Sequence, residues 1–259
     1  MIGNQGWCQG RDSYRIPSET IRTSDYEVEE LADDTTPKNF VLGHHYSGSY
    51  PAARFRFGLR RHGHLVGVSV FSHPCSNRVL TSVFPCSAKE AVELGRFVLL
   101  DEVPGNGETW FLARCFEALR GRVRGILSFS DPVPRSREDG MIVFPGHIGT
   151  IYQAHNARYL GRGKARTLRI LPDGRVFSER AISKIRKKER GWQHCVALLE
   201  SFGAPKLVTE DSALWLKEAL LKVTRKLRHP GNHKYAWGLD RHMRRALPDG
   251  EQYPKRRSA

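Results

Sequence analysis

The strongest constraint on the fold is a pair of apolar stretches joined by a short basic segment. Arg54–Arg60 alternates charged and apolar residues, and Leu65–Phe71 is rich in β-branched residues. The segment between them contains Gly63, which suits a tight turn. These residues predict a β-hairpin, so at least part of the chain is expected to form an antiparallel sheet.

Predicted strands and helices alternate after the hairpin. The sequence predicts a buried strand over Glu93–Leu100, a helix over Glu108–Arg120 and a strand over Gly125–Ser130. A short helix over Ile151–Ala157 and a strand over Arg158–Arg162 follow. This order predicts an α/β fold in which helices flank a mixed central sheet.

Composition divides the chain into three predicted parts. Residues 1–37 are acidic and lack periodicity, which predicts a flexible leader with one short helix over Asp25–Leu31. Residues 38–185 are predicted to form the catalytic domain. Residues 186–259 are predicted to be a basic C-terminal extension that binds DNA, and Ser212–Arg228 within it to be a basic amphipathic helix.

The positive charge is concentrated toward the C-terminus. The sequence has 42 Lys and Arg against 27 Asp and Glu, and residues 158–259 alone hold 25 against 10. Such an excess predicts a polyanionic partner, because each neutralised phosphate releases a counterion. A solvated, solubilising surface is the alternative. The predicted DNA contacts are Arg186, Lys187, Lys188, Arg225, Lys226, Arg228 and Lys234.

The remaining composition bears on the cellular compartment. No apolar run approaches the roughly 20 residues of a membrane span, so no membrane partner is expected. Five scattered cysteines without a Cys-x-x-Cys pair fit a reducing environment, and the predicted location is the cytoplasm. The oligomeric state stays open, with a dimer among the alternatives.

The order of elements from the buried strand to the last predicted strand resembles the GNAT N-acetyltransferase fold. The resemblance implies that Gly105, Asn106 and Gly107 bind the pyrophosphate of acetyl-coenzyme A or another acyl donor. A helix N-terminus favours an anion through its amides and its dipole. Glu102 stands where the family usually has Gln or Arg, and a plain strand-to-helix turn is the alternative.

Four short blocks provide a finer match. They are His-His-Tyr-Ser-Gly-Ser at 44–49, Glu-Leu-Gly-Arg at 93–96, Ser-Phe-Ser-Asp-Pro at 128–132 and Gly-Thr-Ile-Tyr-Gln-Ala-His-Asn at 149–156. In this order and spacing they resemble the phage Mom DNA-modification family over about residues 38–185. The resemblance implies conversion of adenine in DNA to N6-carbamoylmethyladenine in a bacterial host, which protects the DNA from restriction nucleases.

The first block contains the most reactive candidates. The resemblance implies that His45, Tyr46 and Ser47 lie at the active site, with His45 and Tyr46 linked to iron(II). Taken alone, a His-Tyr pair is an incomplete metal site, since two or three further ligands would have to converge on it. His45 is also a candidate for acid–base work or substrate contact, or an interior histidine.

Three further residues are assigned roles. Asp131 ends a strand and can accept a proton or a hydrogen bond from adenine N6, although Asp before Pro also forms turns. The resemblance implies that Tyr152 protonates a departing thiolate; a packing aromatic is the alternative. By family position, Arg96 is expected to contact the group donor or the DNA backbone.

Two other functions stay open. One is a GNAT-fold acyltransferase that acts on another amine, such as a modified nucleobase, RNA or a small molecule. The other is a DNA-binding protein without catalytic activity. Carbamoylmethylation forms an N–CH2 bond, which simple acyl transfer does not, so the predicted chemistry needs a rearrangement, a redox step or an unusual donor.

Overall fold

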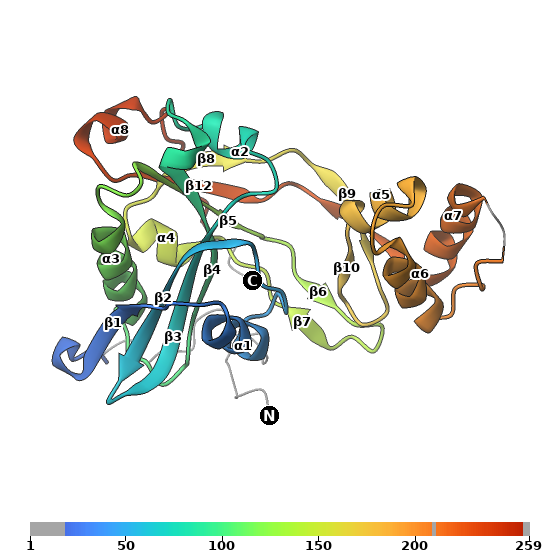
Figure 1. Cartoon of the computed structure of the whole chain (residues 1–259), viewed down its shortest axis with the longest axis horizontal. Helices are drawn as coiled ribbons and strands as arrows, with labels where there is room; N and C mark the ends of the chain where they lie inside the picture. The colour runs from blue at the N-terminus through green and yellow to red at the C-terminus, as the bar shows by residue number, and fades with distance from the viewer. Residues whose placement is uncertain (1–18, 209–210, 256–259) are drawn as a thin grey trace. The chain divides into compact units, whose positions relative to one another are not determined.

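The computed structural model describes residues 19–208 and 211–255, which form two compact units (Figure 1). Unit 1 comprises Met1–Pro132, Gly146–Gly163 and Asn232–Ala259, and unit 2 comprises Val133–Pro145 and Lys164–Gly231. The chain therefore leaves unit 1 twice and returns to it twice. Within the described ranges, no helix is long and apolar enough to cross a membrane.

Unit 1 is built on a seven-stranded sheet with the order β1-β2-β3-β4-β5-β12-β8. The strands are β1 (Tyr26–Glu30), β2 (Ala53–Arg61), β3 (His64–Ser72), β4 (Ala91–Leu99), β5 (Gly125–Ser130), β12 (His233–Gly238) and β8 (Arg158–Arg162). Only β4 and β5 are parallel neighbours, and the other pairs are antiparallel. The predicted mixed α/β fold is confirmed, as is the hairpin formed by β2 and β3.

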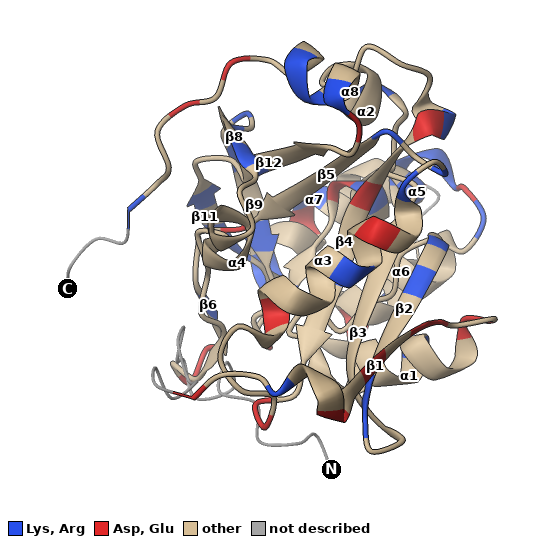
Figure 2. Ribbon diagram, turned by 90° about the vertical axis from the view of Figure 1, so that its left-hand side faces the viewer, with Lys and Arg blue, Asp and Glu red and all other residues tan. Residues whose placement is uncertain are grey.

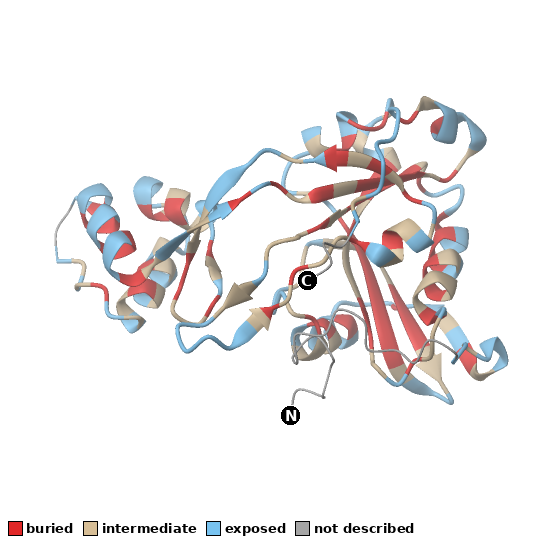
Figure 3. Cartoon of the chain, turned by 180° about the vertical axis from the view of Figure 1, so that it is seen from behind, coloured by how far each residue is buried: buried red, intermediate tan, exposed pale blue. Residues whose placement is uncertain are grey.

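Helices cover both faces of this sheet. Successive residues Val70 and Phe71 of β3 enter different apolar clusters, because neighbouring side chains of a strand point to opposite faces. The Val70 cluster includes Val41 of α1 (Thr35–His44). The Phe71 cluster includes residues of α3 (Gly107–Leu119), and α4 (Thr150–Ala154) adds Tyr152 to it. The buried strands between these helices are visible in Figure 3.

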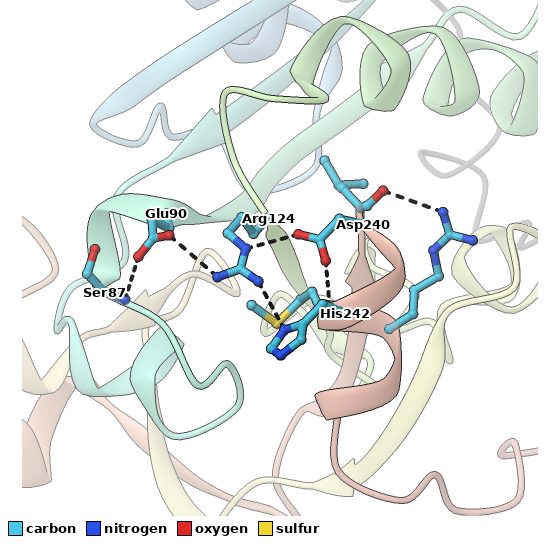
Figure 4. Close-up of polar contacts among 8 residues, drawn as sticks. Ser87, Glu90, Arg124, Asp240 and His242 are labelled. Carbon is cyan, nitrogen blue, oxygen red and sulfur yellow. Dashed lines mark hydrogen bonds and ion pairs between the residues drawn. The ribbon is translucent and has the colours of Figure 1, made fainter.

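Short elements border the sheet near the start of β5. They are α2 (Arg78–Thr81), η3 (Ala88–Glu90) and α8 (Arg241–Ala246), whereas η2 (Thr23–Asp25) directly precedes β1. Arg124 lies 3.6 Å from the Glu90 carboxylate and donates to Asp240 over 3.0 Å (Figure 4). Glu90 also accepts from the Ser87 backbone in a capping box. These contacts join η3, β5 and the start of α8, with the modest energy of exposed ion pairs.

Unit 2 has its own sheet and its own apolar core. The sheet order is β10-β9-β11, formed by β9 (Arg166–Ile170), β10 (Val176–Phe177) and β11 (Arg225–His229). A second ribbon pairs β6 (Arg135–Ser136) with β7 (Ile142–Phe144). The helices α5 (Glu179–Lys187), α6 (Trp192–Ser201) and α7 (Ser212–Val223) enclose a cluster that includes Ile185, Leu199 and Trp215.

The N-terminal region differs from the prediction. Residues 1–18 of the predicted leader lie outside the described residues. Residues 26–30 form a strand, β1, so the prediction of a helix over Asp25–Leu31 is wrong. Edge strand β1 buries Tyr26 and pairs with β2. Glu29 forms an ion pair with Arg60, and Glu30 forms one with Arg122. These acidic residues therefore belong to the sheet and not to a flexible leader.

The C-terminal region also differs. The helix predicted over Ser212–Arg228 ends at Val223, and the basic residues after it form β11. Residues 232–259 belong to unit 1, where β12 lies between β5 and β8, and unit 2 already includes Lys164. The structure therefore draws no boundary at residue 185. Long-range strand pairing, which local periodicity does not report, decides this division.

Candidate active site

The site lies where β4 and β5 separate. The two strands pair only from Ala91 to Glu93, opposite Gly125 to Leu127. Beyond that point, the Ser128 hydroxyl donates to the Leu94 carbonyl over 3.0 Å. The pairing of β4 with β3 is irregular at Gly95, where an added Cβ would clash with the Ser72 hydroxyl. A glycine there permits the bulge that changes the direction of β4 beside the opening.

Arg96 follows the bulge and anchors the first family-like block. Its Nε donates to the Ser49 carbonyl over 2.8 Å, and its Nη2 donates to the Ser49 hydroxyl over 2.7 Å. Nη1 donates to the Gly95 carbonyl. Three guanidinium nitrogens are thus engaged by the protein. In this arrangement Arg96 positions the 44–49 block, and its predicted contact with donor or DNA would need its remaining N–H groups.

His45 is a buried, neutral histidine. Its Nδ1 accepts from the Ser47 backbone amide over 3.1 Å and lies 2.9 Å from the Ser47 hydroxyl. Because Nδ1 accepts, the proton of the neutral ring lies on Nε2. Burial lowers the pKa of His45 well below its ordinary value, and the neighbouring charges of Arg96 and His147 lower it further. At neutral pH this ring is therefore a hydrogen-bond donor through Nε2.

Tyr46 connects the block to the residues after β5. Its hydroxyl lies 3.0 Å from Nε2 of His147. The backbone amide of His147 donates to the carbonyl of Asp131 over 2.8 Å. The structure thus brings Tyr46 and Asp131 to one place through His147. Sequence reasoning missed His147, because it lies in a Pro- and Gly-rich loop outside the four blocks.

Tyr152 lies on α4 with its ring in the core. Its ring centroid is 5.4 Å from that of Tyr235 and 5.7 Å from that of Trp237. Burial raises the pKa of the Tyr152 phenol, while its hydrogen bond with Ser128 and the charge of Arg96 act in the opposite direction. The phenol is therefore protonated at neutral pH and can donate a proton, as the predicted role requires.

Residues of β12 hold α4 in place. The Tyr235 hydroxyl donates to the Ile148 carbonyl and accepts from Gln153 over 3.2 Å. The Trp237 indole donates to the His155 carbonyl over 3.0 Å. Sequence reasoning placed residues 233–238 in the basic C-terminal extension, so it missed that β12 forms part of the support of the site.

Glu93 is a second carboxyl group of the site. It lies on β4 at the last parallel pair with β5, and burial raises the pKa of its carboxyl, with Arg96 acting against this shift. Its charge also raises the pKa of Tyr152, which places the two groups within electrostatic reach of each other. Glu93 is therefore a candidate proton acceptor of the site.

The described side chains do not fit a resident metal ion. His45 Nδ1 is taken by the Ser47 amide, and His147 Nε2 is taken by the Tyr46 hydroxyl. Among residues 19–208 and 211–255, no group of three or more His, Cys, Asp or Glu side chains could hold a metal. The iron link of His45 and Tyr46 stays a prediction that this donor set does not support, and no step is derived through a metal.

The start of α3 fits an anionic group through its backbone. Asn106 is the N-cap residue with φ +66°, and no side chain caps the helix. The Gly107 amide donates to the Pro104 carbonyl, and an added Cβ at Gly107 would clash with Val103, so packing alone requires this glycine. The Gly105 carbonyl accepts from the Ile21 amide. The amides of the first turn of α3 can therefore bind a phosphate. Glu102 is exposed and close in sequence, and its negative charge repels a phosphate.

The predicted DNA contacts fall into both units. Arg186, Lys187 and Lys188 are exposed at the end of α5, and β11 carries Arg225, Lys226 and Arg228, also exposed. Lys234 instead lies in unit 1, on β12 opposite Phe129, and is half-buried. Lys234 therefore belongs to a different unit from the other six predicted contacts.

The mixed sheet has one parallel pair and a helix follows β4, which is the order of elements that the resemblance to the GNAT fold predicts. Two solved structures are similar at low identity: a tandem GNAT protein from the clavulanic acid biosynthesis pathway (TM-score 0.44) and an N-acetyltransferase from Staphylococcus aureus Mu50 (TM-score 0.34). Each is 10% identical, and each match covers 83% of this chain and 99% of the other. The comparison with curated proteins found no match.

The decisive comparison is with protein families. Residues 25–255 match the Mom protein family, and the chain belongs to it. The match extends past the region of resemblance seen in the four blocks and includes both units. Membership supports a role in DNA modification.

Proposed function

We propose that this protein adds a carbamoylmethyl group to N6 of adenine in DNA and so protects that DNA from restriction nucleases. The observation that carries the proposal is the convergence of the family-like blocks at the opening between β4 and β5. Tyr46 contacts His147, which bonds to Asp131, while Arg96 holds Ser49 and acts electrostatically on Tyr152. Residues remote in sequence thus share one site.

Proton transfer is the chemistry that these side chains can supply. The N6 amine loses a proton as its bond to carbon forms, and the group that leaves the donor gains one. Asp131 is the proposed acceptor for the amine proton, and the protonated Tyr152 phenol is the proposed donor to the leaving group. His45, neutral and donating through Nε2, is proposed to orient the substrate.

The proposed group donor is a coenzyme A derivative or a related activated compound whose CH2 carbon bears the leaving group, because attack of N6 on the carbonyl carbon of an acyl-coenzyme A would form an amide and not the N–CH2 bond. Such a donor, when bound, supplies a carbon group with a good leaving group. The Asn106 amide and the first turn of α3 that follows it are the proposed contacts for its pyrophosphate.

The substrate amine also has to be reached. Adenine N6 is paired inside a duplex, so the base must be extruded or taken from unpaired DNA, at a cost of a few kcal/mol. Contacts between a basic surface and the phosphates can offset this cost. The chain's net charge of +15 supports this part of the proposal.

Mass spectrometry of nucleosides tests the proposal. DNA from cells that express the protein is expected to contain an adenine derivative with the carbamoylmethyl mass increment. Asp131→Ala and Tyr152→Phe are expected to abolish the derivative and to leave DNA binding intact. The matched controls are Asp25→Ala and Tyr253→Phe, because Tyr253 also has a bonded hydroxyl, which donates to Ala157. Unmodified DNA with folded wild-type protein would contradict the proposal.

A further inference from the structure

The small sheet of unit 2 has a cationic face. In the pairing of β9 with β11, Arg169 lies directly opposite Lys226 and Thr167 lies directly opposite Arg228. Residues two apart in a strand share a face, so these four side chains lie on the same side of the sheet. We call this set of four residues the cationic face; β9 and β11 together carry five Lys and Arg residues, drawn in blue in Figure 2.

The opposite face of the same strands is different in character. It carries Leu168 opposite Leu227, Ile170 opposite Arg225 and Arg166 opposite His229. Arg225 donates to the Ser136 carbonyl over 2.9 Å and is thus engaged within unit 2. Strand alternation therefore separates Arg225 from Lys226 and Arg228, although the three are close in sequence.

The charges of the cationic face are not compensated within the sheet. Like charges directly opposite each other in a sheet are destabilising, and Arg169 with Lys226 is such a pair. β9, β10 and β11 contain no Asp or Glu. No described residue forms an ion pair with Arg169, Lys226 or Arg228, in contrast to the paired arginines of unit 1, such as Arg122.

The dimensions of the face suit a row of phosphates. Lys226 and Arg228 are two residues apart on one strand, which separates them by about 6.8 Å, or about two 3.4 Å base-pair steps along the axis of a DNA helix. The neighbouring strand adds Arg169 about 4.8 Å away. Arg and Lys contact phosphate oxygens without reading sequence, and the Thr167 hydroxyl can donate to another.

We propose that the cationic face binds the phosphate backbone of duplex DNA, independently of sequence. DNA as the polyanion rests on the proposed function, whereas the phosphate contact is independent of any chemistry at the site in unit 1. The inference adds Thr167 and Arg169 to the predicted DNA contacts and separates Arg225 from them.

Salt-dependent binding to a 20-base-pair duplex tests the proposal with the full chain. Lys226→Gln combined with Arg228→Gln is expected to reduce the slope of log Kobs against log[salt] by about 1.8, or about 0.9 for each lost contact. The control is Lys217→Gln combined with Lys222→Gln, which removes the same charge from exposed positions of α7. An unchanged slope in the folded β11 variant would overturn the proposal.

A single substitution separates binding from a structural role. Arg169→Gln removes one member of the like-charge pair, so it is expected to weaken DNA binding while the midpoint of thermal unfolding stays constant or rises. A lower midpoint with unchanged binding would assign Arg169 to the support of the sheet and overturn its role. Polyglutamate is the second probe. If wild-type protein bound polyglutamate as tightly as DNA, and the variant lost the same affinity for both, the partner would be an acidic protein and the proposal would be overturned.

Nucleoside analysis keeps the two proposals apart. If wild-type protein leaves adenine unmodified but the Lys226 and Arg228 variant loses salt-dependent binding, the proposed function fails and the cationic face stands. If adenine is modified and the variant binds and modifies DNA as the wild type does, the cationic face fails and the proposed function stands.

Discussion

The hydroxyl of Tyr46 lies 3.0 Å from Nε2 of His147, a residue 101 positions later in the chain. The same His147 donates its backbone amide to the carbonyl of Asp131. One histidine therefore fixes the distance between the block that follows α1 and the residue that follows β5. The site depends on this contact for its shape, since no sheet hydrogen bond joins these two segments directly.

Removal of the Tyr46 hydroxyl is expected to reduce modification with little change in stability. Tyr46→Phe keeps the ring and loses one hydrogen bond, so the free energy of unfolding should fall by no more than about 1 kcal/mol. The rate of modification should fall about tenfold, because the site loses the contact that holds its two segments together. Quantitative nucleoside mass spectrometry measures the loss. Tyr253→Phe, which also removes a bonded hydroxyl, is expected to retain full activity. Equal activity of the two variants would show that the Tyr46 contact does not matter.

Arg96 is expected to act by positioning Ser49. Lysine carries the charge but cannot donate to the Ser49 carbonyl and hydroxyl with the geometry of a guanidinium. Arg96→Lys should therefore lower the rate of modification by about tenfold while DNA affinity remains that of the wild type. Arg78→Lys, at an exposed position of α2, is the control. A parallel loss of DNA affinity would instead support direct contact between Arg96 and DNA.

Gly149 is expected to be essential for the α4 turn. Its φ is +74°, and an added Cβ would lie 2.7 Å from the Tyr235 ring. Gly121 has a similar φ of +77° with no atom within 4 Å of an added Cβ. Gly121→Ala should therefore cost only the backbone strain, about 1–2 kcal/mol. Gly149→Ala should cost more, because the clash adds to the strain. Urea unfolding measures the free energy of unfolding of both variants. Equal losses would show that the Tyr235 ring moves away from the added Cβ without cost.

The parts of the fold that follow local patterns could be predicted from the sequence. Strict alternation in β2, the turn glycine at 63 and the apolar spacing of α3 each specify one element on their own. β12 could not be found in this way. Its residues His233–Gly238 combine basic and aromatic side chains, and only pairing with β5 and β8 makes them a central strand.

The candidate site shows the same division. Tyr152 and Asp131 were found because each belongs to a family-like block. The roles of Arg96 and His147 depend on contacts with Ser49 and Tyr46, which are far away in the sequence. No local sequence pattern reports a contact between residues so far apart in the chain, so these two roles could be assigned only from the structure.

Burial of His45 is expected to make the fold sensitive to mild acid. Burial lowers the pKa of His45 in the folded state, whereas in the unfolded chain it titrates near 6.5. As the pH falls below about 6.5, the unfolded chain takes up a proton that the folded chain does not. The free energy of unfolding should therefore be constant with respect to this group above that pH and fall below it.

Substitution of His45 isolates this contribution from that of other groups. Urea unfolding of wild type and His45→Asn between pH 8 and pH 5 should give a smaller loss of unfolding free energy for the variant below pH 6.5. The difference in slope approaches about 1.4 kcal/mol for each pH unit when one proton is involved. His64→Asn, at an exposed position that starts β3, is the matched control for the loss of a histidine. If His45→Asn retained the wild-type slope, His45 would be protonated at mild acid pH in the folded protein, and its assignment as a neutral donor at the site would be wrong.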